Sequence, residues 1–261
     1  MSDRLFASGA EAAIWAAGLP EWVPGRRHFE YVTSTSSTQD MAFAAAKRGA
    51  PSGSLFLAEE QRAGRGRHGS TWVDAAGKSL LFSVLLSGDV VSEGGGRIPL
   101  GAALAVCRAV EELCDAAPAV KWPNDLVLGR RKFGGVLTEV RGGTAVLGVG
   151  INVLQGQADF PAELAGRAVS LAAECPGMVG RVPLLEAVLD QLSLLLGPGH
   201  QSWEEIAAGV AERLAWTGRQ VRVGALQGAV SGISREGHLM LTGRDGRKLV
   251  AVSGSPELIE P

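Results

Sequence analysis

The sequence lacks an excess of charge of either sign. Its 25 lysines and arginines nearly balance its 27 aspartates and glutamates, and the formal net charge is -2. Such a balance supplies no overall attraction to nucleic acid or to an anionic membrane surface. We therefore predict no nucleic-acid partner and no membrane partner, and any bound anion must be held by a local cluster of basic side chains.

Cysteine and long apolar runs are also scarce. The three cysteines include no CxxC pair, which argues against a disulfide framework or a zinc site and is typical of a reducing compartment. No stretch approaches the roughly 18 uninterrupted apolar residues of a membrane-spanning helix. The N-terminus also lacks the basic start and apolar run of a signal peptide. These absences together predict a cytoplasmic protein.

The pattern of apolar and polar residues predicts an α+β fold. Apolar runs typical of strands and alanine- or leucine-rich runs typical of helices follow one another up to about residue 215. From Trp216 the chain changes to short alternating stretches separated by glycine turns, which indicates a small all-β unit. We predict a mixed, mostly antiparallel sheet with helices on one side, followed by a small β-barrel. The expected divisions are an N-terminal extension (1–30), a main domain (31–215) and a C-terminal barrel (216–261).

The loop EEQRAGRGRHGSTW, Glu59–Trp72, alternates glycine with arginine and ends in tryptophan. Its GxGxxG spacing at residues 64–69 matches a dinucleotide-binding fingerprint, but that fingerprint must open a helix. The following stretch, STWVDAAGKS (70–79), has no helical periodicity, so we reject this interpretation. Two alternatives stay open. The loop is either a solvated surface segment, or a lid whose arginines bind an anion and whose tryptophan stacks on a base.

Four further stretches place polar groups or glycine where a ligand could approach. TSSTQD (35–40) is a hydroxyl-rich turn at a predicted helix start, and KWPNDL (121–126) sets a carboxylate at a strand end. RKFGGVLTEV (131–140) places a lysine beside two glycines, and GVGINV (148–153) puts glycine and asparagine into a buried strand. Each stretch alone also fits a structural role, as a helix cap, a turn or a surface lysine.

In this order, the stretches resemble the biotin protein ligase family, the biotin–[acetyl-CoA-carboxylase] ligases. The family's GRGRxGxxW appears as GRGRHGSTW, its KWPND as KWPNDL, its KxxGxLxE as KFGGVLTE and its GxGxN as GVGIN. The resemblance extends over residues 30–261 and implies a catalytic domain of the class II aminoacyl-tRNA synthetase/biotin ligase type with an SH3-like C-terminal barrel. Because residues 1–30 are too few for a helix-turn-helix domain, we expect the monofunctional form without a DNA-binding domain.

The resemblance implies an ATP-dependent biotin–protein ligase. Such an enzyme forms biotinyl-5'-AMP from biotin and MgATP, then transfers biotin to one lysine of a biotin carboxyl carrier protein, a subunit of acetyl-CoA carboxylase or a related carboxylase. Mg2+ would enter with ATP, and no separate metal site in the protein is expected. A homodimer is left open. The alternatives are a lipoate–protein ligase-like enzyme that also forms an acyl-adenylate, and a non-catalytic biotin sensor.

The resemblance also assigns roles to individual residues. Lys132, Arg65 and Asp125 are the implied catalytic residues, with Lys132 bridging the carboxylate and the α-phosphate and Asp125 positioning the acceptor lysine. The implied biotin-binding residues are Ser37, Thr38, Gln39, Gln61, Gly64, Arg65, Arg67, Lys132, Gly134 and Gly135. The implied ATP- or adenylate-binding residues are Arg67, Trp72, Asn124, Lys132, Gly148, Gly150 and Asn152. Gln39 departs from the family pattern, which favours asparagine at this position.

Overall fold

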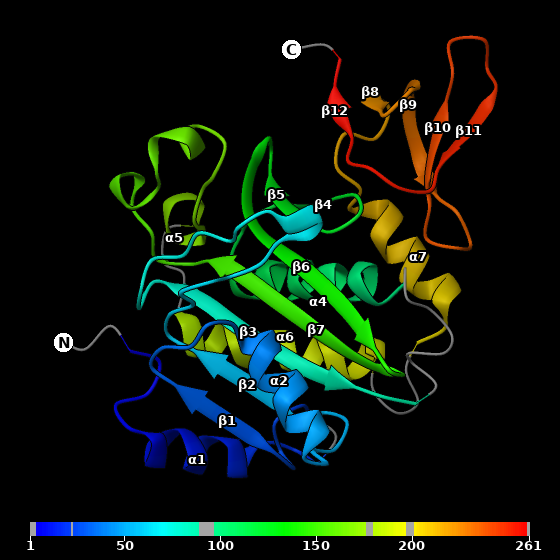
Figure 1. Cartoon of the computed structure of the whole chain (residues 1–261). Coiled ribbons are helices and arrows are strands. Elements are labelled where there is room, and N and C mark those ends of the chain that lie inside the picture. The colour runs from blue at the N-terminus through cyan, green and yellow to red at the C-terminus, as the bar shows by residue number, and fades with distance from the viewer. Residues whose placement is uncertain (1–3, 22, 89–96, 176–179, 197–200, 260–261) are drawn as a thin grey trace.

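The main structural unit is a seven-stranded sheet in the order β1-β2-β3-β7-β6-β5-β4 (Figure 1). The computed structural model describes residues 4–21, 23–88, 97–175, 180–196 and 201–259. β1 and β2 are parallel, and the other neighbouring strands are antiparallel, which confirms the predicted mixed, mostly antiparallel sheet. The strands are β1 (Phe29–Val32), β2 (Leu55–Ala58), β3 (Ser79–Leu86), β4 (Pro118–Lys121), β5 (Asp125–Leu128), β6 (Arg131–Arg141) and β7 (Thr144–Asn152).

Helices cover both faces of this sheet, whereas the sequence predicted helices on one side only. α4 and α6 pack against each other on one face, and α2 lies on the other (Figure 1). The second face is apolar because Phe56, Leu85 and Val146 pack there against Phe43 of α2. The α-helices are α1 (Gly9–Gly18), α2 (Thr38–Lys47), α4 (Arg97–Leu113), α5 (Leu171–Glu174), α6 (Arg181–Leu196) and α7 (Trp203–Glu212). None of them in the described part of the chain has the length and apolar character needed to cross a lipid bilayer.

The KWPND stretch forms a turn between two strands, and Asp125 lies at a strand end, as the sequence predicted. β4 ends at Lys121 and β5 begins at Asp125, and these two residues face each other across the antiparallel pair. Between them, the buried Trp122 donates its indole N–H to the carbonyl oxygen of Gly237 at 2.9 Å. The turn thereby joins the main sheet to the C-terminal unit.

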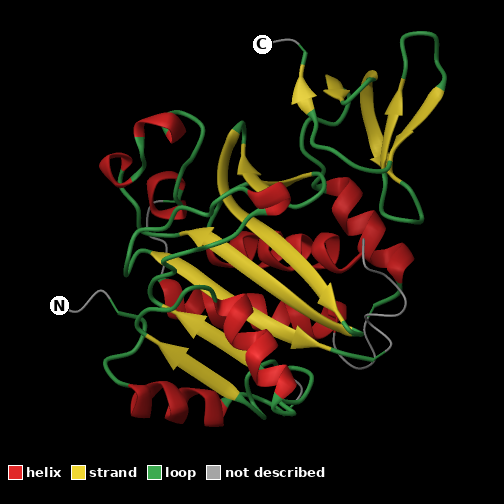
Figure 2. Cartoon of the chain, viewed as in Figure 1, coloured by secondary structure: helices red, strands yellow, loops and turns green. Residues whose placement is uncertain are grey.

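The C-terminal unit is a five-stranded antiparallel sheet in the order β11-β10-β9-β8-β12 (Figure 2). This is consistent with the predicted SH3-like barrel. Its apolar side chains, among them Val221 and Leu241, belong to the same core cluster as those of the main sheet. The division of the chain into domains after residues 30 and 215 therefore stays a prediction. The strands are β8 (Gln220–Val223), β9 (Leu226–Ile233), β10 (Leu239–Thr242), β11 (Lys248–Ala251) and β12 (Glu257–Leu258).

The N-terminal segment packs against β1 and shares a buried polar network with it. The carboxylate of Glu59, just after β2, accepts hydrogen bonds from the backbone N–H of Leu5 at 2.6 Å and from the hydroxyl of Tyr31 at 2.5 Å. Its other oxygen lies 2.7 Å from Nη1 of Arg181, at the start of α6. Both charged side chains of this ion pair are almost completely buried, with 3% of Arg181 and 6% of Glu59 exposed. One carboxylate therefore holds three segments that are far apart in the sequence.

Candidate functional site

A cavity of about 310 Å³ lies where the start of α2, the arginine-rich loop, β6 and β7 meet. Glycines of β6 and β7 leave this part of the sheet open, because they carry no side chain that would fill it. Most residues that the sequence predicted for the site line the cavity. These are Ser37, Thr38, Gln39, Gln61, Arg65, Arg67, Trp72, Asn124, Asp125, Lys132, Gly135, Gly148 and Gly150.

Three predicted residues, Gly64, Gly134 and Asn152, do not line this cavity. Gly64 lies at the start of the loop over the cavity, where its carbonyl oxygen accepts the backbone N–H of Trp72 at 2.9 Å. A Cβ on Gly134 would lie 2.9 Å from Cδ1 of Leu126 and 3.0 Å from the Gly150 carbonyl oxygen, so this glycine permits close packing within the protein. Asn152 lines a neighbouring cavity. Direct ligand contacts by these three residues stay predictions.

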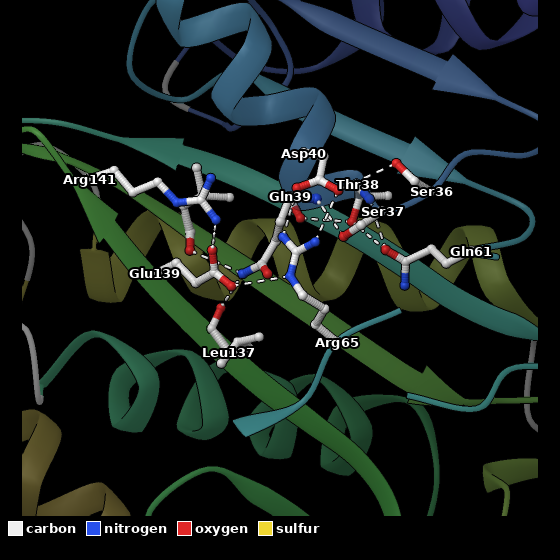
Figure 3. A network of polar contacts seen from close by, with 12 residues as sticks. Ser36, Ser37, Thr38, Gln39, Asp40, Gln61, Arg65, Leu137, Glu139 and Arg141 are labelled. Carbon is white, nitrogen blue, oxygen red and sulfur yellow. Dashed lines mark hydrogen bonds and ion pairs between the residues drawn. The ribbon is translucent and has the colours of Figure 1, made fainter. Parts of the chain in front are cut away.

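The end of the cavity next to α2 is built from amides and hydroxyls (Figure 3). Oε1 of Gln61 accepts hydrogen bonds from N and Oγ1 of Thr38 at 2.8 and 3.1 Å, and Oγ1 of Thr38 lies 2.8 Å from Oγ of Ser83. Since its oxygen is occupied by Thr38, Gln61 offers a ligand its NH2 group. This polar end can therefore bind a flat ligand group that has its own donors and acceptors.

Gln39 lies across the floor of the same end. Its side-chain NH2 donates to the carbonyl oxygen of Leu137 at 2.9 Å (Figure 3). A Cβ on Gly148 would lie only 3.0 Å from that nitrogen. Glutamine at position 39 is longer than the asparagine that the family favours, and it fits because residue 148 is glycine. Gln39 and Gly148 together set the depth of the cavity.

The loop over the cavity, Gly64–Trp72, forms a short hairpin that we call the lid. Arg65 and Thr71 face each other in an antiparallel bridge, and the N–H of Gly66 donates to the carbonyl oxygen of Ser70 at 2.7 Å. A side chain on Gly66 would collide with the Ser70 hydroxyl. No α-helix follows within the described residues 70–88, as the sequence predicted, so this loop is not a dinucleotide-binding turn.

Arg65 of the lid contacts two carboxylates that the sequence did not assign to the site (Figure 3). Two of its nitrogens lie 2.9 and 3.0 Å from the oxygens of Asp40, and its Nε lies 3.3 Å from Glu139. The guanidinium of Arg65 lowers the pKa of Asp40 below its ordinary value, mainly through this hydrogen bond. The signal for Glu139 was present, since it is the last residue of the KFGGVLTE stretch.

Lys132 and Trp72 meet at the centre of the site. Nζ of Lys132 lies 2.5 Å from Oδ1 of Asp125 and 5.8 Å from the centre of the Trp72 ring. The ring packs against Gly150, where a Cβ would lie 2.8 Å from the indole. Gly150 therefore has to be glycine for the indole to rest on the sheet in this position.

A second cavity, of about 630 Å³, adjoins the first. The two cavities share Trp72, Asp125 and Lys132, and the second adds three basic side chains, Lys121, Arg130 and Arg167. Burial lowers the pKa of Lys121, although the nearby Asp125 opposes the shift. A ligand that occupied both cavities would pass directly beside the Lys132 ammonium group.

The C-terminal unit also reaches the site, which the sequence alone did not reveal. Gly254 and Ser255 line the first cavity. Nη1 of Arg67 in the lid lies 3.4 Å from the carbonyl oxygen of Gly254 and 3.4 Å from Oδ1 of Asn124. Because 187 positions separate Arg67 from Gly254, only the fold brings them together.

Comparisons with known proteins agree on one family. The model of the biotin/lipoate A/B protein ligase family matches residues 31–155. The chain is 32% identical over 246 residues to the bifunctional ligase/repressor BirA of Bacillus subtilis, which covers 89% of this chain and 74% of that protein. It is 34% identical over 218 residues to the biotin–[acetyl-CoA-carboxylase] ligase of Mycobacterium tuberculosis, which covers 81% of this chain and 80% of that protein. The solved biotin protein ligase from Aquifex aeolicus in complex with biotin and ATP has a TM-score of 0.78 at 26% identity, and the match covers 90% of this chain and 100% of that one.

Proposed function

The chain belongs to the biotin protein ligases of the biotin/lipoate A/B protein ligase family, and from this premise we propose that it joins biotin to a carrier protein in two steps. In the first step, biotin and MgATP form biotinyl-5'-AMP and release pyrophosphate. In the second step, a lysine of a biotin carboxyl carrier protein, a subunit of acetyl-CoA carboxylase or a related carboxylase, receives the biotinyl group and AMP leaves.

The use of ATP and three free cysteines favour a cytoplasmic location.

The observation that carries this proposal is the junction of the two cavities at Lys132. The first cavity has a polar closed end suited to the ring of biotin, and the second has the basic side chains suited to a nucleotide. The biotin carboxylate and the α-phosphate of ATP would then meet beside the ammonium group of Lys132. A carboxylate oxygen of biotin attacks the α-phosphorus, and Lys132 stabilises the negative charge that builds up on the oxygens around it. Mg2+ would be held mainly by phosphate oxygens and water and would offset charge on the leaving pyrophosphate.

Asp125 is suited to the second step. Its carboxylate is paired with Lys132 at 2.5 Å and lines both cavities. When the ammonium group of Lys132 moves to the acyl-phosphate, Asp125 can accept a hydrogen bond from the incoming amine of the carrier lysine. The amine nitrogen attacks the biotinyl carbonyl carbon, the bond to the AMP oxygen breaks, and Asp125 takes up the proton that the amine loses.

The polar end of the cavity favours biotin over lipoate. Lipoate ends in an apolar dithiolane ring, which would leave the NH2 group of Gln61 without a partner. It would also offer no acceptor to the hydroxyl of Ser37, whose oxygen already accepts the N–H of Gln39 at 3.3 Å. The ureido ring of biotin has both N–H and C=O groups to satisfy them. The cationic and carboxylate groups at the junction favour an enzyme over a sensor, because binding alone does not need a lysine placed between the two cavities.

The direct test is a transfer assay with the purified chain, MgATP and a biotin carboxyl carrier domain. Labelled biotin and labelled lipoate are supplied in parallel, and a reaction without ATP serves as the control. We expect label on the carrier only with biotin and only with ATP. Transfer of lipoate alone would establish the lipoate alternative, and biotin binding without either adenylate or transfer would establish the sensor.

The contact between Gly150 and Trp72 gives a further prediction. Gly150→Ala places a methyl group 2.8 Å from the nearest indole atom, so the ring must shift from its position beside Lys132. We expect the rate of adenylate formation at low ATP concentration to fall by on the order of 10-fold, because the free-energy cost of an overpacking substitution corresponds to a rate change of this size. The matched control is Gly18→Ala, where an added Cβ has nothing within 4 Å. Equal rates for the two variants would show that this position of the indole is not needed.

A further inference from the structure

We propose that Asp40 and Glu139 are positioning residues that hold the lid closed through Arg65, and that this closure retains the acyl-adenylate. The part about retention rests on the proposed function, whereas the part about closure does not. The two carboxylates, which we call the carboxylate pair, lie on α2 and on β6, on either side of the lid residue that they bind (Figure 3).

The geometry ties the lid to two separate walls of the site. Arg65 reaches Asp40 with two nitrogens, at 2.9 and 3.0 Å, and Glu139 with Nε at 3.3 Å. A planar guanidinium that contacts two carboxylates at once is fixed in direction as well as in distance. Because Arg65 is also bridged to Thr71 through the hairpin, its position determines where the whole lid lies.

Glu139 is itself held in place from outside the cavity. Nη2 of Arg141 lies 2.6 Å from Oε2 of Glu139, and the Arg141 guanidinium carbon lies 4.1 Å from the centre of the Phe43 ring. Phe43 is on α2, so the chain of contacts runs from the lid to β6 and on to the helix that carries Asp40. With two carboxylates and two guanidinium groups, the network is electrically neutral.

The strength of these contacts suits a lid that opens and closes. The side chains are partly exposed, with 32% of Arg65, 43% of Asp40 and 24% of Glu139 accessible, and exposed ion pairs are individually weak. Several pairs on one guanidinium can still favour the closed lid. Opening then requires no buried charge to be left unpaired, so substrates can enter.

Charge separates this proposal from a simpler one in which Arg65 acts only as an anion-binding group. Neutralising a carboxylate next to Arg65 makes the site more positive, which by itself should slow the loss of the anionic adenylate. If the carboxylates hold the lid closed, the same change should speed that loss. The two explanations therefore predict opposite signs for one measurement.

The first experiment measures amide hydrogen exchange of the ligand-free chain and needs no substrate. The Asp40→Asn/Glu139→Gln double variant is compared with the wild type at the N–H groups of Gly66 and Trp72, which are bonded within the lid. We expect exchange at both to accelerate about 10-fold or more. The matched control is Glu30→Gln, which removes a partly exposed carboxylate paired with Arg48. Unchanged exchange in the double variant would overturn the proposal, whatever the chain's activity.

The second experiment measures how fast the chain releases labelled biotinyl-5'-AMP that it has formed from biotin and ATP. We expect release by the double variant to be about 10-fold faster than by the wild type. Added salt should speed release by the wild type much more than by the variant, because salt screens the ion pairs that the variant lacks. Release that stays constant or becomes slower would refute the role in retention. If the wild type forms no adenylate at all, the proposed function fails while the exchange result still decides whether the lid is held closed.

Discussion

Replacing Lys132 with alanine is expected to slow adenylate formation by on the order of 100-fold or more. The side chain lies at the junction of the two cavities, so its charge is closest to the atoms that react. Removing a single group that stabilises charge developing in the transition state typically slows a reaction by about this factor. The effect should appear in kcat more than in KM, because the charge builds up only as the reaction proceeds. Single-turnover release of labelled pyrophosphate from ATP, with biotin present, measures this step directly.

Lys78→Ala is the matched control for this substitution. Lys78 is exposed to a similar degree, 35% against 39% for Lys132, and is also paired with one aspartate, Asp159, at 2.7 Å. It lines neither of the two cavities. We expect the control to form adenylate within about 2-fold of the wild type, as surface substitutions usually do. If Lys132→Ala performed as well as the control, Lys132 would have no role in charge stabilisation and the two-cavity mechanism would have to be abandoned.

Much of the site could be predicted from sequence because its elements are local. The glycine and arginine positions in the lid, the cap of α2 and the Lys132 stretch each lie within a few consecutive residues. Their order along the chain was therefore enough to suggest the family. The positions of most strands followed from the same kind of information, since an apolar run of strand length can be recognised without knowledge of its partners.

The parts that sequence reasoning missed depend on contacts between distant segments. Asp40 was visible only as the last residue of TSSTQD at a predicted helix start, and Glu139 only as the last residue of KFGGVLTE. Their common role became apparent when α2 and β6 were seen on either side of Arg65. The same applies to the two hydrogen bonds that join the site to the C-terminal unit, from Arg67 to Gly254 and from Trp122 to Gly237. Tertiary packing, rather than local propensity, decides such contacts.

The second face of the sheet is a related case. An alanine-rich helix such as α2 gives no sequence signal for the face on which it will pack. The side is decided by Phe56 and Leu85, whose neighbours in β2 and β3 point to the opposite face. Because both faces of these strands are apolar, both have to be covered. The start of α2 is thereby brought over the glycines of β7, which is what closes the polar end of the cavity.

Replacing Glu59 with alanine is expected to lower the free energy of unfolding by about 3–5 kcal/mol, the usual cost of removing one partner from a buried ion pair. Arg181 would keep its hydrogen bond to the carbonyl oxygen of Ser79 but would lose the carboxylate that balances its charge. Burial, with the hydrogen bond to Glu59, also raises the pKa of Tyr31, so its hydroxyl stays a donor and would lose its acceptor. Urea unfolding followed by circular dichroism measures the change.

Two comparisons make this prediction specific to the buried network. Glu59→Gln keeps the size of the side chain and an acceptor for Leu5 and Tyr31, so it should cost less than Glu59→Ala. Glu30→Gln removes a carboxylate that is paired with Arg48 and one third exposed, and it should change stability by no more than about 0.5 kcal/mol. Because Glu59 also binds the N–H of Leu5, its loss should make residues 5–21 more sensitive to proteases before the main sheet unfolds. Should Glu59→Ala match the Glu30→Gln control in both measurements, the ion pair with Arg181 would not be what holds the N-terminal segment against β1.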